Sequence, residues 1–214
     1  AKTFIDIMSN SNNNRVFDIW GVQLEKGAFA TSFIPTRDGL VATRGADITL
    51  IDGEEFSEFY NPIESTIVVD YTHHDGVSTS NIGNQPRVYK FQAVGGNDTR
   101  IDYVSNTGYN PYIAKDASAV ASLAHGQSTV FGGGMNRAAV RVKEDSFGVS
   151  FNGSAVSGSA LDTSGAWNPT NTITEVSIGG QSTGSAGNQL SGHIQRFMYY
   201  SVGLPDSQLV TLTS

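Results

Sequence analysis

Residues that form turns interrupt this chain at short intervals, and that spacing limits the possible fold more than any other feature. Almost every candidate element is a short run of β-branched or aromatic residues bounded by Gly, Asn, Asp, Ser or Pro. Such runs are typical of a β-sandwich, whereas βα units alternate strands with long helical stretches. The sequence therefore predicts an all-β antiparallel sandwich. Its clearest predicted strands are residues 66–71, 87–94, 99–104, 138–142 and 147–151.

Two connections predict β-hairpins. Asn152-Gly153 separates residues 148–151 from residues 154–156, and this dipeptide suits a type I′ turn because both central residues need positive φ. Glu144-Asp145 follows Lys143 and is predicted to form a second hairpin tip.

The last strand is predicted from a period of two over residues 193–200. Ile194, Arg196, Met198 and Tyr200 alternate with His193, Gln195, Phe197 and Tyr199. Aromatic residues occur in both sets, so we expect the strand to be buried on both faces.

Helix is scarce in the sequence. Pro205 suits a first helical position, so residues 204–209 are predicted to form one short helical turn. Residues 114–124 are rich in alanine but lack an amphipathic stripe, and both a helix and a loop crossing between sheets remain open for them.

Composition allows one large β domain and disfavours several partners. The chain has 214 residues, 24 glycines and 38% hydrophobic residues, enough for a substantial core. A net charge of −7 and a pI near 4.9 disfavour nucleic acid and anionic lipid, which require clustered Lys and Arg. No apolar run is long enough for a membrane helix and no signal pattern opens the chain, so we expect a soluble protein without membrane insertion. The absence of cysteine suits assembly in a reducing bacterial cytoplasm.

Three segments resemble the concanavalin A-like lectin and glucanase sandwiches of the laminin G-like kind. They are Gly-x-Ile-x-Arg-Phe-x-Tyr-Tyr at 192–200 with the Leu-Pro segment after it, the strand and Asn-Gly turn at 148–153, and Glu-Val-Ser-Ile-Gly-Gly at 175–180. The resemblance implies a jelly-roll sandwich over residues 39–214.

The first part of the chain resembles a different module. Residues 20–36 read Trp-Gly-x-Gln-Leu-Glu-x-Gly-x-x-Ala-Thr-Ser-Phe-Ile-Pro-Thr, which looks like the end of a carbohydrate-binding-like sandwich of bacteriophage tail fibres and tailspikes. The resemblance implies that residues 1–38 are terminal strands of that preceding domain, or an N-terminal connector. It also implies a homotrimer located in the virion, with other tail proteins as partners.

Catalytic chemistry is the less favoured interpretation of the acidic residues. A retaining glycosidase needs two carboxyl groups about 5 Å apart. The nearest candidates are Asp52, Glu54, Glu55 and Glu58, which lack the Glu-x-Asp-x-x-Glu pattern of the related glucanases. We therefore expect a solvated turn at 52–58, and keep a polysaccharide depolymerase or lyase as the alternative function.

Metal binding is predicted only weakly. His73-His74-Asp75 follows a predicted strand, but adjacent strand residues point to opposite faces, and the other histidines, His125 and His193, are far away in sequence. No cofactor is expected except a possible structural calcium ion, because the resembling domains often hold one and hard oxygen ligands are present. The calcium candidates are Asp70, Asp75 and Asp98, with Asn97 and Asp102 as further oxygen donors.

Sugar recognition suits two predicted loops. It requires aromatic faces for stacking and amides or carboxylates for hydroxyl groups. The candidate contact residues are Tyr109, Asn110, Tyr112, Trp167 and Asn168. The alternative is that these rings close the ends of the sandwich.

These features lead to one functional hypothesis and two alternatives. The hypothesis is a non-catalytic receptor-binding domain of a phage tail fibre or similar virion appendage, which recognises a glycan or polysaccharide on the host surface. A depolymerase or lyase on the same fold is one alternative. A purely structural appendage or capping protein is the other.

Overall fold

A computed structural model describes residues 35, 49–73, 87–93, 100–104, 112–115, 118–123, 134–157, 167, 173–180, 189–190 and 192–214. The chain divides into two compact units, Ala1–Arg44 and Gly45–Ser214. Pro35 alone is described in the first unit, so the domain boundary after residue 38 stays a prediction. No helix among the described residues is long and apolar enough to cross a membrane.

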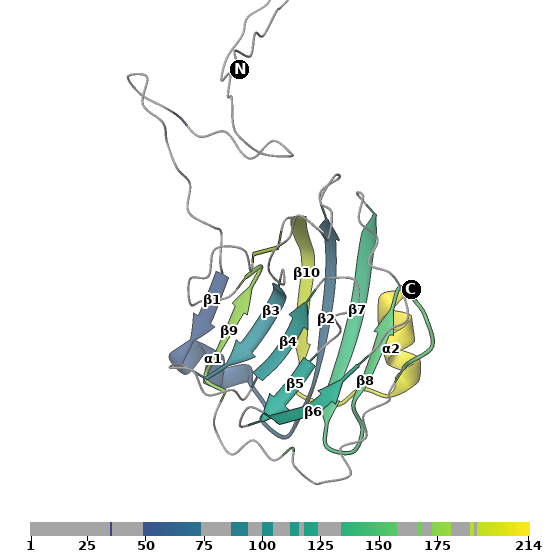
Figure 1. Cartoon of the computed structure of the whole chain (residues 1–214), viewed down its shortest axis with the longest axis horizontal. Coiled ribbons are helices and arrows are strands. Elements are labelled where there is room, and N and C mark those ends of the chain that lie inside the picture. The colour runs from purple at the N-terminus through teal and green to yellow at the C-terminus, as the bar shows by residue number, and fades with distance from the viewer. Residues whose placement is uncertain are drawn as a thin grey trace, which may run out of the picture. The chain divides into compact units, whose positions relative to one another are not determined.

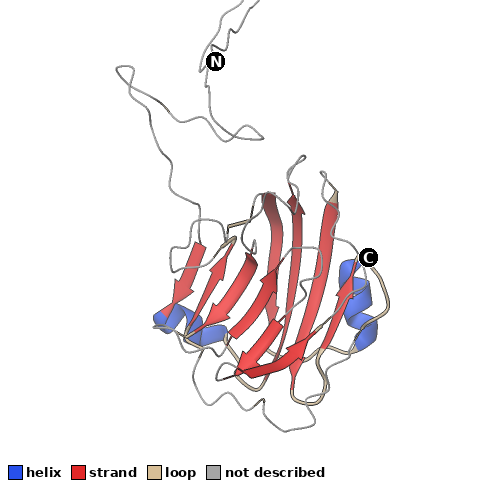
Figure 2. Ribbon diagram, in the orientation of Figure 1, coloured by secondary structure: helices blue, strands red, loops and turns tan. Residues whose placement is uncertain are grey.

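The second unit is a sandwich of two antiparallel sheets, which confirms the predicted fold class (Figures 1 and 2). The six-stranded sheet has the order β1 (Thr49–Asp52), β9 (Glu175–Ile178), β3 (Arg87–Gln92), β4 (Arg100–Val104), β5 (Tyr112–Lys115) and β6 (Ser118–Ser122). The four-stranded sheet has the order β10 (Gly192–Tyr200), β2 (Glu64–His73), β7 (Met135–Lys143) and β8 (Gly148–Phe151). Two short helices complete the unit, α1 (Gly53–Phe59) and α2 (Asp206–Thr213).

Apolar side chains from both sheets interdigitate in the core. Tyr89 of β3 lies 5.7 Å from Phe197 of β10 between ring centroids, and Phe91 lies 5.8 Å from Tyr199. From the first contact to the second, the residue number rises by two on each strand. Strands β3 and β10 therefore run in the same direction across the core. Since side chains alternate along a strand, Lys90 and Gln92 lie on the opposite, outer face of the six-stranded sheet.

The closing strand departs from the predicted alternation at one point. A bulge separates Ile194, which pairs with Tyr71, from Arg196, which pairs with Asp70. The extra residue moves Ile194 to the core side with Phe197 and Tyr199. The sequence interpretation had grouped Ile194 with Arg196 and was wrong there.

Helix α2 covers the outer face of the four-stranded sheet. Leu209 packs against Val68 and Ala139, and all three side chains are 0% exposed. The guanidinium group of Arg196 donates to the Leu212 carbonyl at 2.8 Å, and that of Arg137 donates to the Ser214 carbonyl at 2.7 Å. Cations near a helix C-terminus offset the negative end of its dipole. Helix α2 spans 8 residues, so it is longer than the single turn that the sequence predicted.

The hairpin at Glu144-Asp145 is confirmed by the pairing of β7 with β8, and the turn at Asn152-Gly153 is confirmed, but residues 154–156 form no strand. Asn152 and Gly153 have φ values of 48° and 71°, as a type I′ turn requires, and Asp145 has a φ of 54° in the other turn. After Gly153 the returning segment forms only a bridge, between Val149 and Ser157.

Two local interpretations are corrected by the structure. The alanine-rich segment forms the hairpin of β5 and β6, because strand pairing determines the conformation where helix propensity alone is weak. Residues 53–59 form α1 where a turn was expected. Phe56 anchors this helix with 2% exposure and stacks on Tyr60 at 4.7 Å.

Candidate functional site

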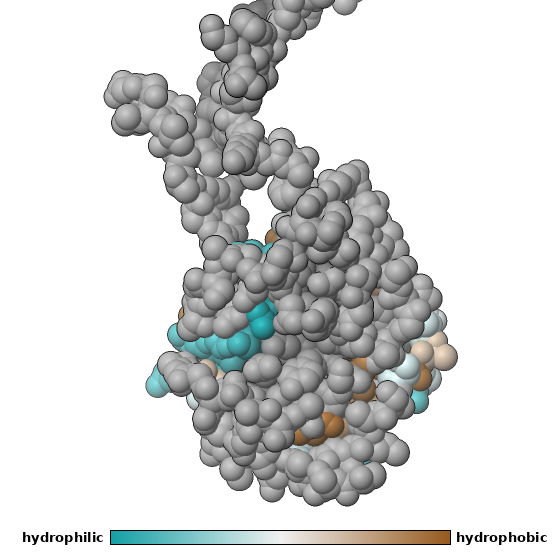
Figure 3. Space-filling view, in the orientation of Figure 1, coloured by the Kyte–Doolittle hydropathy of each residue, from teal (hydrophilic) through white to brown (hydrophobic). Residues whose placement is uncertain are grey.

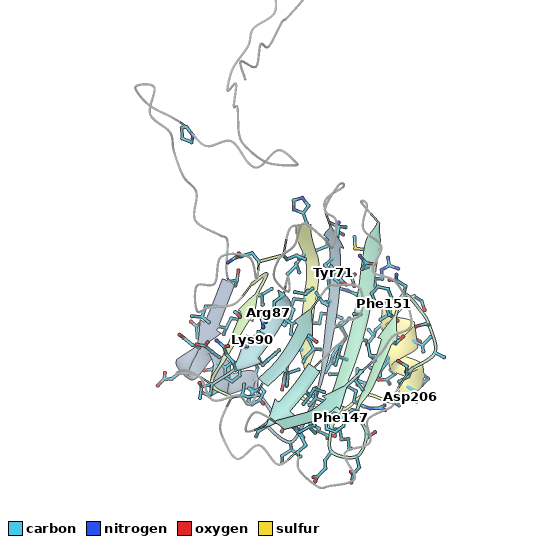
Figure 4. The ribbon with its side chains drawn as sticks, viewed as in Figure 1. Tyr71, Arg87, Lys90, Phe147, Phe151 and Asp206 are labelled. Atoms are coloured by element: carbon cyan, nitrogen blue, oxygen red, sulfur yellow. The ribbon has the colours of Figure 1, made fainter. Side chains whose placement is uncertain are left out.

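The outer face of the six-stranded sheet carries buried polar side chains on its central strands. Lys90 and Gln92 of β3 are 7% and 6% exposed, and Glu175 and Ser177 of β9 are 6% and 0% exposed. Lys90 pairs with Ser177 across the strands, and Gln92 pairs with Glu175. We call these four residues the polar face. Figure 4 labels Lys90 on β3, with Tyr71 and Phe151 on strands of the other sheet.

The strand register shows which residues continue the two rows of the polar face across the whole sheet. One row runs through residues 50, 177, 90, 102, 112 and 122, and a second runs through residues 52, 175, 92, 100 and 114. Residue 112, a predicted sugar contact, therefore lies in the same row as Lys90. The side chains of residues 100, 102 and 112 lie outside the description.

Hydrogen bonds hold part of the polar face in place. The Gln92 amide nitrogen donates to the Glu175 carboxylate, and the Ser177 hydroxyl donates to the Gly180 carbonyl at 2.9 Å. Burying polar groups is unfavourable unless they are hydrogen-bonded, so these hydrogen bonds offset part of the free-energy cost of burying the polar face. Together the four residues place an ammonium, a carboxylate, a carboxamide and a hydroxyl group on one face of the sheet, and none of the four is more than 7% exposed. These chemical groups are the kind that pair with sugar hydroxyl groups.

Trp167 does not lie where the sequence interpretation placed it. Its side chain is 2% exposed and belongs to the core cluster, with a ring contact of 6.3 Å to Phe147. The prediction of an accessible stacking face at Trp167 is therefore wrong, because a large apolar ring gains more from burial than from exposure in a polar segment. Of the other predicted contacts, Tyr109, Asn110 and Asn168 lie outside the described residues.

Asp70 is also corrected, as a calcium candidate. Its carboxylate lies 2.9 Å from an Arg196 nitrogen and 3.9 Å from an Arg137 nitrogen. Two guanidinium groups already neutralise this carboxylate and would repel a cation. Asp75 and Asp98 lie outside the described residues, and within the described part no group of three or more metal-binding side chains occurs.

The acidic segment forms the N-terminal part of α1 and the strand before it. Asp52, Glu54, Glu55 and Glu58 are all exposed, which agrees with the expected solvation although not with the expected turn. Asp52 ends β1 and pairs with Glu175 across the strands. This is the only pair of opposed carboxylates among the described strand registers.

Sequence reasoning missed the polar face. Its signal was present in Arg-Val-Tyr-Lys-Phe-Gln and in Glu-Val-Ser-Ile, where polar and apolar residues alternate. Lys90 and its cross-strand partner Ser177 are 87 residues apart in sequence, so only the register of β3 with β9 shows that the polar positions of the two segments form one surface.

Comparison with known proteins identifies the fold and no family. No family model matches the chain, and no curated protein matches it. Among solved structures, it is similar to the carbohydrate-binding module CBM40 of the Ruminococcus gnavus IT-sialidase, described as bound to α2,3-sialyllactose. That match has a TM-score of 0.52 and 15% identity over 71% of this chain and 83% of that one.

Two further structures share the architecture. A pentraxin from Limulus polyphemus matches with a TM-score of 0.50 and 12% identity, over 71% of this chain and 70% of that one. The NanB sialidase of Streptococcus pneumoniae matches with a TM-score of 0.52 and 12% identity, over 78% of this chain and 27% of that one. At these identities the matches establish a concanavalin A-like sandwich.

Proposed function

We propose that this domain binds a glycan without cleaving it, through the outer face of the six-stranded sheet. The observation that carries the proposal is the polar face, where Lys90, Gln92, Glu175 and Ser177 lie side by side on two neighbouring strands. An ammonium group and a carboxamide donate to sugar hydroxyl groups, and a carboxylate accepts from them. Residue 112 in the same row adds an aromatic residue type, suited to stacking on a sugar ring.

The fold supports this proposal by analogy. The R. gnavus module with the same architecture is described as bound to a sialylated sugar. Function depends on the site and not on the fold, so the side chains of this domain determine whether it binds a glycan.

We further propose that the domain belongs to a phage tail fibre or related virion appendage and recognises a host cell-surface glycan. Support comes from the Trp-Gly to Ile-Pro-Thr phrase at residues 20–36, which resembles the end of a tail-fibre module. By the same resemblance the assembly is a homotrimer, with other tail proteins as partners and a location in the virion.

The test measures retention of the protein on host polysaccharides and the size of the polysaccharide afterwards. Lys90→Met removes the ammonium group and keeps much of the side-chain volume, so it is expected to reduce retention. Lys143→Met makes the same change on the other sheet, where Lys143 is 48% exposed, and is expected to leave retention unchanged. Equal retention of both variants and the parent, with both variants folded, would reject the polar face as the site.

Chain length of the polysaccharide separates binding from catalysis. We expect it to stay unchanged. Shortening would favour a depolymerase, for which Asp52 and Glu175 are the first candidates because opposed residues on antiparallel strands have Cβ atoms about 5 Å apart. Retention failing on every host polysaccharide would favour a structural cap.

A further inference from the structure

A cavity of about 700 Å³ lies beside α1, and the glycan proposal does not use it. Its described lining comes from the end of β1, from α1 and the segment after it, and from the residues before β9. The lining residues are Asp52, Gly53, Phe56, Ser57, Tyr60, Pro62, Ile173 and Thr174. We call this cavity the α1 pocket. Its volume falls within the range of small-ligand sites, about 300–1,000 Å³.

The floor of the α1 pocket is apolar and uncharged. Phe56 and Ile173 belong to the core cluster, and the rings of Phe56 and Tyr60 are stacked with centroids 4.7 Å apart. Burial raises the pKa of Tyr60 far above its ordinary value, so its ring carries no charge at any physiological pH. This floor suits methyl or methylene groups of a ligand.

The charged side chain among the described lining residues is Asp52, and no described residue is its partner. Asp52 occupies the N-cap position of α1, where an aspartate side chain ordinarily accepts a hydrogen bond from the first helical turn. Here it makes no capping bond, and the described part of the chain gives it no ion pair or other hydrogen bond. The carboxylate is therefore available to a ligand in the pocket.

The negative charges near Asp52 favour a positively charged ligand. Glu175 lies directly opposite Asp52, and like charges at opposed strand positions repel each other. Helix α1 adds Glu54, Glu55 and Glu58 and has no basic residue in its last turn. Figure 3 shows hydrophilic surface gathered where α1 lies. Two cationic residues lie in the register rows of this face: Lys90 lies two strands from Asp52 in the neighbouring row, and Arg100 lies three strands away in the same row, about 14 Å at the usual spacing of neighbouring strands.

We propose that the α1 pocket binds a small organic ammonium ion with an apolar body. The ammonium group would lie at the Asp52 carboxylate, and its methyl or methylene groups would pack on Phe56, Tyr60 and Ile173. An anion is disfavoured by the five carboxylates of Asp52, Glu54, Glu55, Glu58 and Glu175, and an uncharged ligand leaves the charge of Asp52 uncompensated. A fully hydrated metal ion would not use the apolar floor.

The test titrates choline into the full chain and follows the backbone amide NMR signals. Choline combines a quaternary ammonium group with a compact methyl-rich body. Saturable shifts are expected at Phe56, Ser57 and Thr174. The matched control ligand is the uncharged carbon isostere of choline, which has the same shape and is expected to give no saturable shifts. This experiment uses no glycan, so its outcome is independent of the polar face.

Two variants make the test specific to the Asp52 carboxylate. Asp52→Asn is expected to weaken choline binding about fivefold, the factor that corresponds to an exposed charge pair of about 1 kcal/mol. Glu58→Gln removes a charge of the same sign from α1, but Glu58 is not among the described residues that line the pocket, and its effect should stay below about twofold. Three results would overturn the proposal: no saturable shifts with choline, equal binding of the isostere, or equal weakening by both variants.

Discussion

The two outer faces of the sandwich are built in opposite ways. On the four-stranded sheet, Val68 and Ala139 present an apolar surface that α2 covers through Leu209. On the six-stranded sheet, the corresponding face carries the polar side chains of Lys90, Gln92, Glu175 and Ser177, which are 0–7% exposed. A sheet face that needs only stability is closed with apolar side chains, and the polar face departs from that solution. The difference therefore directs the search for function to the six-stranded sheet.

The largest expected effect comes from opening the covered face. Leu209→Ala removes a side chain that is 0% exposed, and we expect a loss of about 2–4 kcal/mol in the free energy of unfolding, measured in urea. Gln208→Ala alters the exposed side of the same helix and should change it by less than about 0.5 kcal/mol. Similar losses in both variants would mean that α2 does not cover this face.

A smaller effect is expected from the charged group beside α2. Asp70→Asn removes the partner of Arg196 and Arg137, and we expect a loss of about 1–2 kcal/mol because Asp70 is mostly buried and the arginines are partly exposed. Urea unfolding with and without calcium measures it. Stabilisation of the parent by calcium that the variant lacks would restore Asp70 as a metal ligand.

The next effect on stability concerns the turn at Gly153, which lies against the C-terminal residue Ser214. Straining the backbone at this one residue is expected to lower the free energy of unfolding. Gly153 has a φ of 71°, and a Cβ atom there would lie 3.3 Å from the Ser214 hydroxyl oxygen. Gly153→Ala is expected to cost about 1 kcal/mol. Gly153→Asn is the control, because Asn tolerates this conformation better than Ala does. If Gly153→Asn lowers the melting temperature more than Gly153→Ala does, the space around the side chain limits stability at this position, and the backbone φ does not.

The smallest effect concerns an exposed ion pair at the end of the covered sheet. A hydrogen bond from Lys143 lowers the pKa of Glu64 below its ordinary value of 4.5, with Nζ and Oε2 2.8 Å apart. The pair therefore stabilises the fold above that value, and the stabilisation is lost as the pH falls through the lowered pKa.

Glu64→Gln tests this sign. We expect a loss of less than about 1 kcal/mol at neutral pH that disappears in strong acid. Urea unfolding of both proteins across that pH range measures the difference. A difference that grows as the pH falls would contradict the assigned direction.

Local signals predicted the local parts of the fold. The positive φ values at Asn152 and Gly153 followed from the residue types alone, and β10 followed from its alternation. Helix α1 was missed because its many carboxylates resemble a solvated turn, although Phe56 and Tyr60 lie one helical turn apart on its inner side.

Long-range pairing determines what the sequence could not predict. Whether residues 114–122 form a helix or a hairpin depends on β4, which β5 joins. The polar face needs the register of β3 with β9, and the burial of Trp167 involves Phe147 from the connection between β7 and β8. Of the predicted sugar contacts in the described part of the chain, residue 112 lies in the register row of Lys90.

The bulge in β10 makes the length of this strand adjustable. Gln195 is the residue without a pairing partner, while Ile194 opposite Tyr71 and Arg196 opposite Asp70 already alternate in the order of an unbroken ladder. Removing Gln195 would leave Ile194 toward the core and Arg196 toward α2. The strand can therefore lose a residue at this position without exchanging its two sides, whereas a deletion elsewhere in β10 would turn half of it inside out.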